Sequence, residues 1–180
     1  MKKLFSNRVF ATCLTVVLMI VSVVMNTRVK LGKQCEALDM SFYSENSISD
    51  SLQKLCDASS KICFLARQFD IDEVGQTEDD ISSLRSLLDL KEKNLAHIHS
   101  YYESLLTDTF RLESALSRAE LSEEGRTLLS EAQHDAAAAK ASIDASDYND
   151  RVRTFLKYND HFPTAQISAV SGVRFPQVFA

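Results

Sequence analysis

Apolar residues recur through most of the chain at alternating spacings of three and four, the pattern typical of amphipathic helices. The first such stripe predicts a helix from about Ile48 to Phe69. One face of this helix carries Ile48, Leu52, Leu55, Ser59, Ile62, Ala66 and Phe69. The turn that follows is expected in residues 70–76, which contain Gly75.

A longer stripe predicts a second helix, which opens at Thr77 with a capping residue followed by three acidic side chains. Its positions follow a heptad pattern over more than five heptads, and ten of the twelve are apolar or aromatic: Ile81, Leu84, Leu88, Lys91, Leu95, Ile98, Tyr102, Leu105, Thr109, Leu112, Leu116 and Ala119. An average spacing of 3.5 residues indicates coiled-coil-like packing of nearly parallel or antiparallel helices.

Ser122 is the predicted N-cap of a third helix that runs to about His161. One face carries Leu129, Ala132, Ala136, Ala139 and Ile143, and a second register follows with Tyr148, Val152, Phe155, Asn159 and Phe162. The alanine run at 136–139 has little bulk, so a neighbouring helix can approach it closely. Three amphipathic helices with short turns predict an antiparallel bundle. Its fourth helix would come from residues 34–47, from a split of the second helix or from a partner subunit.

The N-terminal region has a different pattern. Between Arg8 and Arg28 lie 19 uncharged and mostly apolar residues, which as a helix would span about 28 Å, close to the thickness of a hydrocarbon core. This length predicts an uncleaved signal-anchor that crosses the bilayer at about residues 9–27. A cleaved secretory signal, a lipoprotein signal and a buried core helix are the alternatives. Against a cleaved secretory signal, the apolar run is longer than a usual signal core and no A-x-A-like site follows it. Against a lipoprotein signal, Cys13 precedes the apolar run instead of following it.

Charge supports this division of the chain. The formal net charge is −5, yet the first 35 residues hold six basic residues and no acid. The acidic remainder would repel a phosphate backbone, so no nucleic-acid partner is expected. The two sides of the apolar run carry almost the same number of positive charges, with one more in the short N-terminal head. Because the more positive flank usually stays in the cytoplasm, we expect the body outside it.

The scarcity of turn residues excludes most β-rich folds. The chain has 4 Gly and 2 Pro, and both prolines lie near its end, at Pro163 and Pro176. We therefore expect an all-α fold in four parts: a basic head and transmembrane anchor (1–33), a connector (34–47), a helical bundle (48–162) and an extended apolar tail (163–180). The connector is expected to continue the membrane helix outward, and the cluster Ser44, Asn46 and Ser47 then forms a break with an N-cap.

Candidate catalytic groups are sparse. Glu131 and His134 share a helix face, but a di-iron bundle needs this pair twice. His97 and His99 point to different faces, and His99 is expected to pair with Glu103 one turn later. We therefore predict no enzymatic activity, no catalytic residue, no metal site and no cofactor.

The cysteines do not form a zinc pattern. Cys56 and Cys63 are one heptad apart, too far to pair with each other, and are expected as small buried side chains. A bridge from Cys35 to either of them, or between chains, stays open.

The tail after His161 is apolar and carries one charge. It either folds back over the open end of the bundle or offers an apolar strip to a partner or a membrane surface. Its motif residues, together with those at the end of the third helix, are Tyr148, Asn149, Val152, Phe155, Phe162, Pro163, Ile167, Gly172 and Phe179.

These residues and their spacing resemble the closing signature of the LemA family, over roughly the last 32 residues. The basic head and the single N-terminal span resemble the family as well. The family has an acidic residue and an arginine before the Tyr148-Asn149 pair, and these positions are Ala138 and Ala145 here. The arginine-rich early helices of the family have no counterpart in residues 48–76. The resemblance, as to a divergent member, implies a membrane-anchored antiparallel four-helix bundle without an established catalytic activity.

The sequence thus predicts a single-pass interaction or scaffold module of a bacterial envelope. Its partners would be the bilayer, through residues 9–27, and a protein or a second copy, through helix faces or the tail. An extracytoplasmic sensory domain is an alternative, although only eight residues precede the span. A metal-binding bundle enzyme is a further alternative.

Overall fold

The computed structural model describes residues 2–72, 74–161 and 164–180, and the regular elements among them are all helices. The predicted all-α fold is therefore confirmed. The helices, in chain order, are α1 (Lys2–Phe42), α2 (Ile48–Arg67), α3 (Val74–Asp89), α4 (Leu95–Leu116), α5 (Glu123–Asp144), α6 (Tyr148–Asn159) and α7 (Thr164–Ser171).

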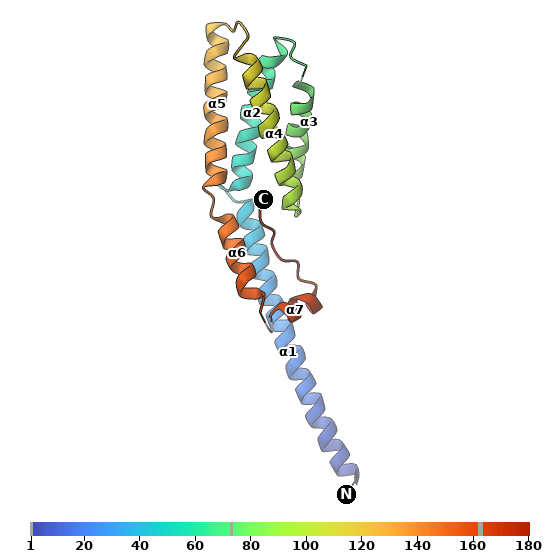
Figure 1. Cartoon of the computed structure of the whole chain (residues 1–180). Helices are drawn as coiled ribbons and strands as arrows, with labels where there is room; N and C mark the ends of the chain where they lie inside the picture. The colour runs from blue at the N-terminus through green and yellow to red at the C-terminus, as the bar shows by residue number, and fades with distance from the viewer. Residues whose placement is uncertain (1, 73, 162–163) are drawn as a thin grey trace.

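Helices α2 to α5 form an antiparallel four-helix bundle at one end of an elongated molecule (Figure 1). Helix α2 packs against all three others, and most closely against α5. The small side chains of α5 allow this close approach: Ala132 and Ala139 are buried, and the hydroxyl of Ser51 donates a hydrogen bond across the interface to Ser142 at 3.0 Å.

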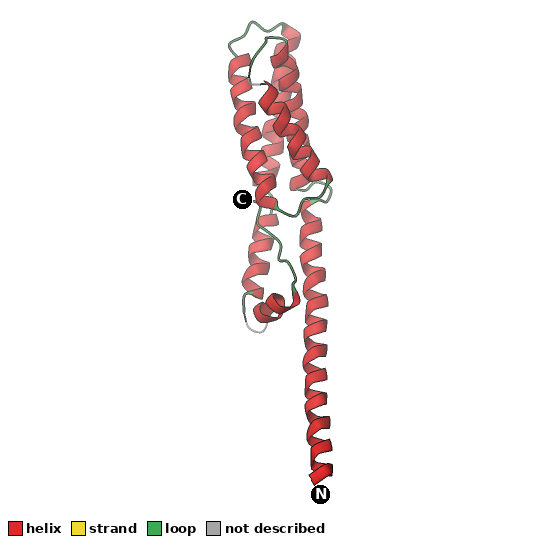
Figure 2. Cartoon of the chain, turned by 90° about the vertical axis from the view of Figure 1, so that its right-hand side faces the viewer, coloured by secondary structure: helices red, strands yellow, loops and turns green. Residues whose placement is uncertain are grey.

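Helix α1 forms the shaft of the molecule. It is one continuous helix of 41 residues, about 60 Å long, and the N-terminus lies at the end far from the bundle (Figure 2). Helices α6 and α7 lie beside the half of α1 that is nearer to the bundle (Figure 1). The connector thus continues the first helix as far as Phe42, and α2 begins after Ser47 at its predicted N-cap position.

The predicted apolar stripes form the bundle core. On α2 every predicted face residue is buried except Phe69, which lies beyond the helix end. Every position of the long stripe that lies in α3 or α4 is buried, and these helices also bury Val74, Thr77 and Asp108. The stripe positions Lys91 and Ala119 lie outside the two helices and are not buried. Ser59 and Thr109 are buried together between α2 and α4, where their hydroxyls form a hydrogen bond of 2.9 Å.

The prediction of one long second helix is wrong, because the chain reverses direction between α3 and α4. Lys91 has a positive φ of 49°, the amide of Lys91 donates to the carbonyl of Leu88, and the amide of Glu92 donates to that of Leu87. These two bonds form a Schellman cap with lysine where glycine is usual. The split supplies the fourth helix of the bundle, one of the three sources that the sequence left open.

The turn between α2 and α3 is shorter than predicted. Asp70 lies in the turn after α2 and has the left-handed conformation, with φ 55°. Helix α3 then begins at Val74. Gly75 therefore lies within the first turn of α3 and Thr77 is a buried helical residue, so the prediction of Thr77 as the cap is wrong.

The third predicted helix is interrupted at residues 145–147, where α5 ends and α6 begins. The interruption falls where the apolar stripe changes register from Ile143 to Tyr148. Ser122 caps α5 as predicted, since its hydroxyl accepts a hydrogen bond from the amide of Gly125 at 3.1 Å.

The tail combines a helix and an extended strap. Residues 164–171 form α7, so the prediction of an extended chain is wrong there and holds only from Gly172 onward. The strap, residues 172–180, runs back towards the bundle, and the C-terminus lies at the base of the bundle (Figure 1). Of the two alternatives for the tail, the folded-back arrangement is thus the one observed.

Candidate functional site: the anchor helix and the junction above it

The first half of α1 exposes its apolar side chains on all sides. The segment from Arg8 is long and apolar enough to cross a membrane, and none of its most apolar 18-residue window is buried by the rest of the protein. Val9, Phe10, Leu18, Met19 and Val23 are each more than half exposed. A core helix would bury such side chains, so the alternative of a buried core helix is excluded.

The second half of α1 is packed instead of exposed. Leu31, Cys35 and Phe42 are buried against the rest of the protein, and no break separates this half from the apolar half. Within the apolar half, the hydroxyls of Thr12 and Thr15 donate to carbonyls four residues earlier. These bonds satisfy polar groups that would be costly in lipid.

Above the anchor, three helices and the strap meet at an aromatic socket around Phe179, which is only 4% exposed. The ring of Phe179 lies 5.6 Å from the ring of Phe42 on α1 and 5.7 Å from that of Tyr102 on α4. His99 of α4 packs edge-on at 4.9 Å, and Tyr148 of α6 contacts Phe42 at 5.4 Å. The last aromatic residue of the chain thus closes the base of the bundle.

The socket also binds the backbone of the strap. The side-chain amide of Asn149 donates to the carbonyl of Phe179 at 2.9 Å and accepts from its amide at 2.8 Å. The hydroxyl of Tyr148 donates to the carbonyl of Gln177 at 3.0 Å. In the other direction, the side-chain oxygen of Gln177 accepts from the amide of Leu95 at the start of α4, at 3.0 Å.

The motif residues carry most of this junction. Tyr148, Asn149 and Phe179 meet in the socket, and Val152 is fully buried next to them on α6. Phe155 packs edge-on against Phe175 of the strap at 5.6 Å. Of the remaining four motif residues, Gly172 starts the strap with φ +67°, the side chain of Ile167 is not described, and Phe162 and Pro163 lie outside the described residues.

Burial changes the ionisation of groups around the junction. Removal from water raises the pKa of Tyr43 to about 12, with the charges of Glu92 and Asp39 adding to the effect, and raises the pKa of Tyr148 as well. Burial also raises the pKa of Asp39, against the opposing charges of Lys93 and Arg174. Both tyrosines are therefore neutral at physiological pH and act as hydrogen-bond donors.

Part of the socket has no signal in the sequence. The sequence pattern places Tyr102 only at one position of a heptad stripe, and it assigns no role to Phe42 or Gln177. These residues lie at least 60 positions apart in the sequence and meet only in the folded protein. No local pattern could have identified them as a set.

The candidate metal residues do not converge. Glu131 and His134 are exposed on α5, and His99 pairs with Glu103 at 3.6 Å as predicted. Among the residues that the structure describes, no three His, Cys, Asp or Glu side chains are grouped so that they could hold a metal ion.

The cysteines are free thiols. Cys35, Cys56 and Cys63 are buried, and burial raises the pKa of their thiols to about 11, 12 and 11. They are therefore protonated and inaccessible to reagents. Cys13, on the apolar half of α1, is exposed.

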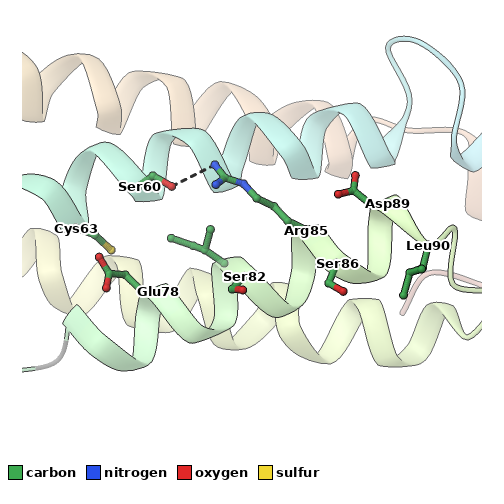
Figure 3. Close-up of a pocket in the computed structure, with 9 residues that line it drawn as sticks. Ser60, Cys63, Glu78, Ser82, Arg85, Ser86, Asp89 and Leu90 are labelled. Atoms are coloured by element: carbon green, nitrogen blue, oxygen red, sulfur yellow. Dashed lines mark hydrogen bonds between the residues drawn. The ribbon is translucent and has the colours of Figure 1, made fainter.

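Among the described residues, two of the grooves on the surface of the body lie between neighbouring helices. One, of about 620 Å³, lies between α2 and α3 and is crossed by Arg85, which donates to Ser60 (Figure 3) and pairs with Asp57 at 2.7 Å. A second groove, of about 690 Å³, lies between α1 and α6 close to the anchor, and Leu38, Phe155 and Tyr158 form its apolar wall. Tyr158 is 77% exposed, so this wall is open to solvent.

Comparison of the chain with protein-family models, with curated proteins and with solved structures found no match.

Proposed function

We propose that this chain is a single-pass membrane protein of the LemA type, whose helical body acts as an interaction or scaffold module at the surface of a bacterial cell membrane. It performs no catalysis in this proposal. The bilayer binds residues 9–27, and a protein or a second copy binds the body or the tail.

The observation that carries the proposal is the continuity of α1. Its exposed apolar half and its packed half form a single helix, so the body is attached to the anchor without a flexible linker. A cleaved signal needs an accessible cleavage segment, whereas the helix here continues unbroken past Thr27 and buries Leu31.

The junction brings several of the motif residues together. Asn149 bonds to the backbone of Phe179, and the rings of Tyr148 and Phe179 both pack against Phe42, which gives the motif a structural role. The groove between α1 and α6 and the exposed Phe64 and Phe110 of the bundle offer apolar surface for a protein partner.

Membrane retention tests the anchor. Membranes that contain the full chain are washed with alkaline carbonate, and the protein in each fraction is measured by its mass. Wild-type chain should stay with the membrane at its uncleaved mass of 20.2 kDa. A double variant, Val17→Arg with Ile20→Arg, should move to the soluble or degraded fraction, because each arginine at the centre of a span costs about 3 kcal/mol.

The matched control for this experiment is Val17→Leu with Ile20→Leu, which keeps the segment apolar and should be retained like the wild type. Release of the wild-type chain by carbonate, or a mature chain that begins after residue 27, would contradict the proposal.

Orientation is tested by cysteine labelling, but not with the native thiols of the body, which are buried. We expect Ser82→Cys, at an exposed position of α3, to react with an impermeant reagent on intact cells when Cys13 is replaced by serine. Labelling only after cell lysis would put the body in the cytoplasm and reverse the proposed orientation.

A further inference from the structure

We propose that the socket around Phe179 is a peptide-binding site, and that it accepts the same C-terminal strap from a second copy of the chain in the same membrane. The strap then occupies the site either in its own chain or in a neighbour. This inference rests on the proposed membrane anchoring and names the second copy as one partner.

The socket has the chemistry of a peptide site. Asn149 binds both the amide and the carbonyl of Phe179, so it reads the backbone of an extended segment and not a side chain. The aromatic rings of Phe42, Tyr102 and His99 then select a ring at that position. Backbone bonds combined with one buried side-chain anchor are the usual means of binding an extended peptide.

The strap can separate from its own chain as a unit. It belongs to no helix from Gly172 onward, and Gly172 can serve as its hinge, because its φ is +67° and open space surrounds its Cα where a side chain would begin. Outside the socket and the bonds of Gln177, the strap is held by the Phe155–Phe175 contact and by a bond from Arg174 to the carbonyl of Lys93. Pro176 is also buried, and Val178 packs against the core. The strap is therefore bound as a ligand tethered to the fold.

The anchor gives a second copy the right geometry. Copies in one membrane stand parallel, so each socket lies at the same height as the neighbour's strap. The stretch from Gly172 to Phe179 can reach about 23 Å, roughly twice the diameter of a helix. The exchanged strap makes the same contacts as in its own chain, so exchange depends mainly on the local concentration of copies.

Two complementary variants test the exchange in the full, membrane-inserted chain. One copy carries Asn149→Ala, which weakens the socket and keeps the strap, and a differently tagged copy carries Phe179→Ala, which removes the anchor ring and keeps the socket. When both are expressed together, the intact socket can accept the intact strap. We expect the mixed pair to co-purify at least fivefold more than either variant paired with itself.

Equal co-purification of the mixed and the self-paired samples would overturn the exchange. Membrane retention and circular dichroism on the same samples separate a failure of anchoring from a failure of exchange. If a variant loses its helices, a photoreactive phenylalanine at position 179 of an otherwise unchanged chain decides the matter. Adducts between two copies support the exchange, and adducts confined to single chains overturn it.

Discussion

The bundle and the junction beneath it are stabilised in different ways. The core of α2 to α5 consists mainly of aliphatic side chains at heptad positions, and many residues share the burial. The junction depends on a few aromatic rings and on side chains that bind backbone groups, with Phe179 and Asn149 at its centre. Loss of one core residue of the bundle should therefore mainly lower the free energy of unfolding. Loss of one junction residue should mainly disorder the structure around it.

This difference has a functional consequence. A bundle with a distributed core unfolds cooperatively, whereas a strap held by few contacts can open while the rest stays folded. If the protein changes state when it binds a partner, the junction is the region that can change at low cost. Substitutions in the two regions test this contrast, beginning with the one that should destabilise the protein most.

Leu105→Ala should lower the free energy of unfolding by about 4 kcal/mol, because Leu105 is fully buried in the bundle and the cavity cannot refill. Chemical denaturation of the detergent-solubilised chain, followed by circular dichroism, measures the change. The control is Phe110→Ala on the same helix, where the ring is 69% exposed and the change should be near zero. Equal effects of the two substitutions would mean that the bundle core is not the distributed core described here.

The bundle is largely predictable from sequence, because helical packing requires a periodic pattern. The pattern identifies the face of α2 and the stripe through α3 and α4 residue by residue. It does not identify the split at Lys91, because the Schellman cap there uses a lysine in the left-handed conformation and the usual glycine signal is absent. Lys91, one of the two polar positions in the stripe, lies at the break. A polar residue in such a stripe more often stays within its helix, as Thr109 does, so Lys91 alone does not predict the break.

The junction is predictable only as a set of motif residues, without their contacts. Tyr148, Asn149 and Phe179 come from a resemblance, and nothing in the pattern says that the asparagine binds the backbone of the phenylalanine. Phe42 and Tyr102 complete the socket from distant elements. Contacts of this kind depend on the tertiary fold and leave no periodic trace in the sequence.

Phe179→Ala should open the junction and leave the bundle folded. Loss of the buried ring costs about 3 kcal/mol, which corresponds to about 100-fold faster amide exchange in α6 and at the start of α4. Hydrogen exchange with mass spectrometry measures the two regions separately. Phe64→Ala, which removes a ring that is 60% exposed on α2, is the control and should change neither region. Equal acceleration throughout the bundle would show that the two regions unfold together.

Asn149→Ala should have a similar but smaller effect on α6, of about 2 kcal/mol, because the amide and the carbonyl of Phe179 lose their partners while the ring stays buried. The matched control is Asn159→Ala on the same helix. The amide of Asn159 bonds to the carbonyl of Phe155 one turn earlier and not to the strap, so its loss should cost much less. If both asparagines gave the same change in exchange rate, the backbone contact would not be what holds the strap.

The smallest predicted effect concerns a carboxyl in the bundle. Burial raises the pKa of Glu113 above its ordinary value of 4.5, and the hydrogen bond from Gln133 opposes this only in part. The folded state therefore binds a proton more tightly than the unfolded state, so stability falls as the pH rises from about 4.5 through the raised pKa. Glu113→Gln should remove this fall and stabilise the bundle by less than about 1 kcal/mol at neutral pH, since the group is only half-buried and partly screened.

Unfolding measured from pH 4 to 7, a range that begins just below the ordinary pKa of a glutamate, tests this expectation. The control is Glu120→Gln, at an exposed position in the turn after α4, and it should keep the wild-type slope. A wild-type slope in Glu113→Gln would place the origin of the pH dependence in the junction, where burial raises the pKa of Asp39 against Lys93 and Arg174, and not in the bundle.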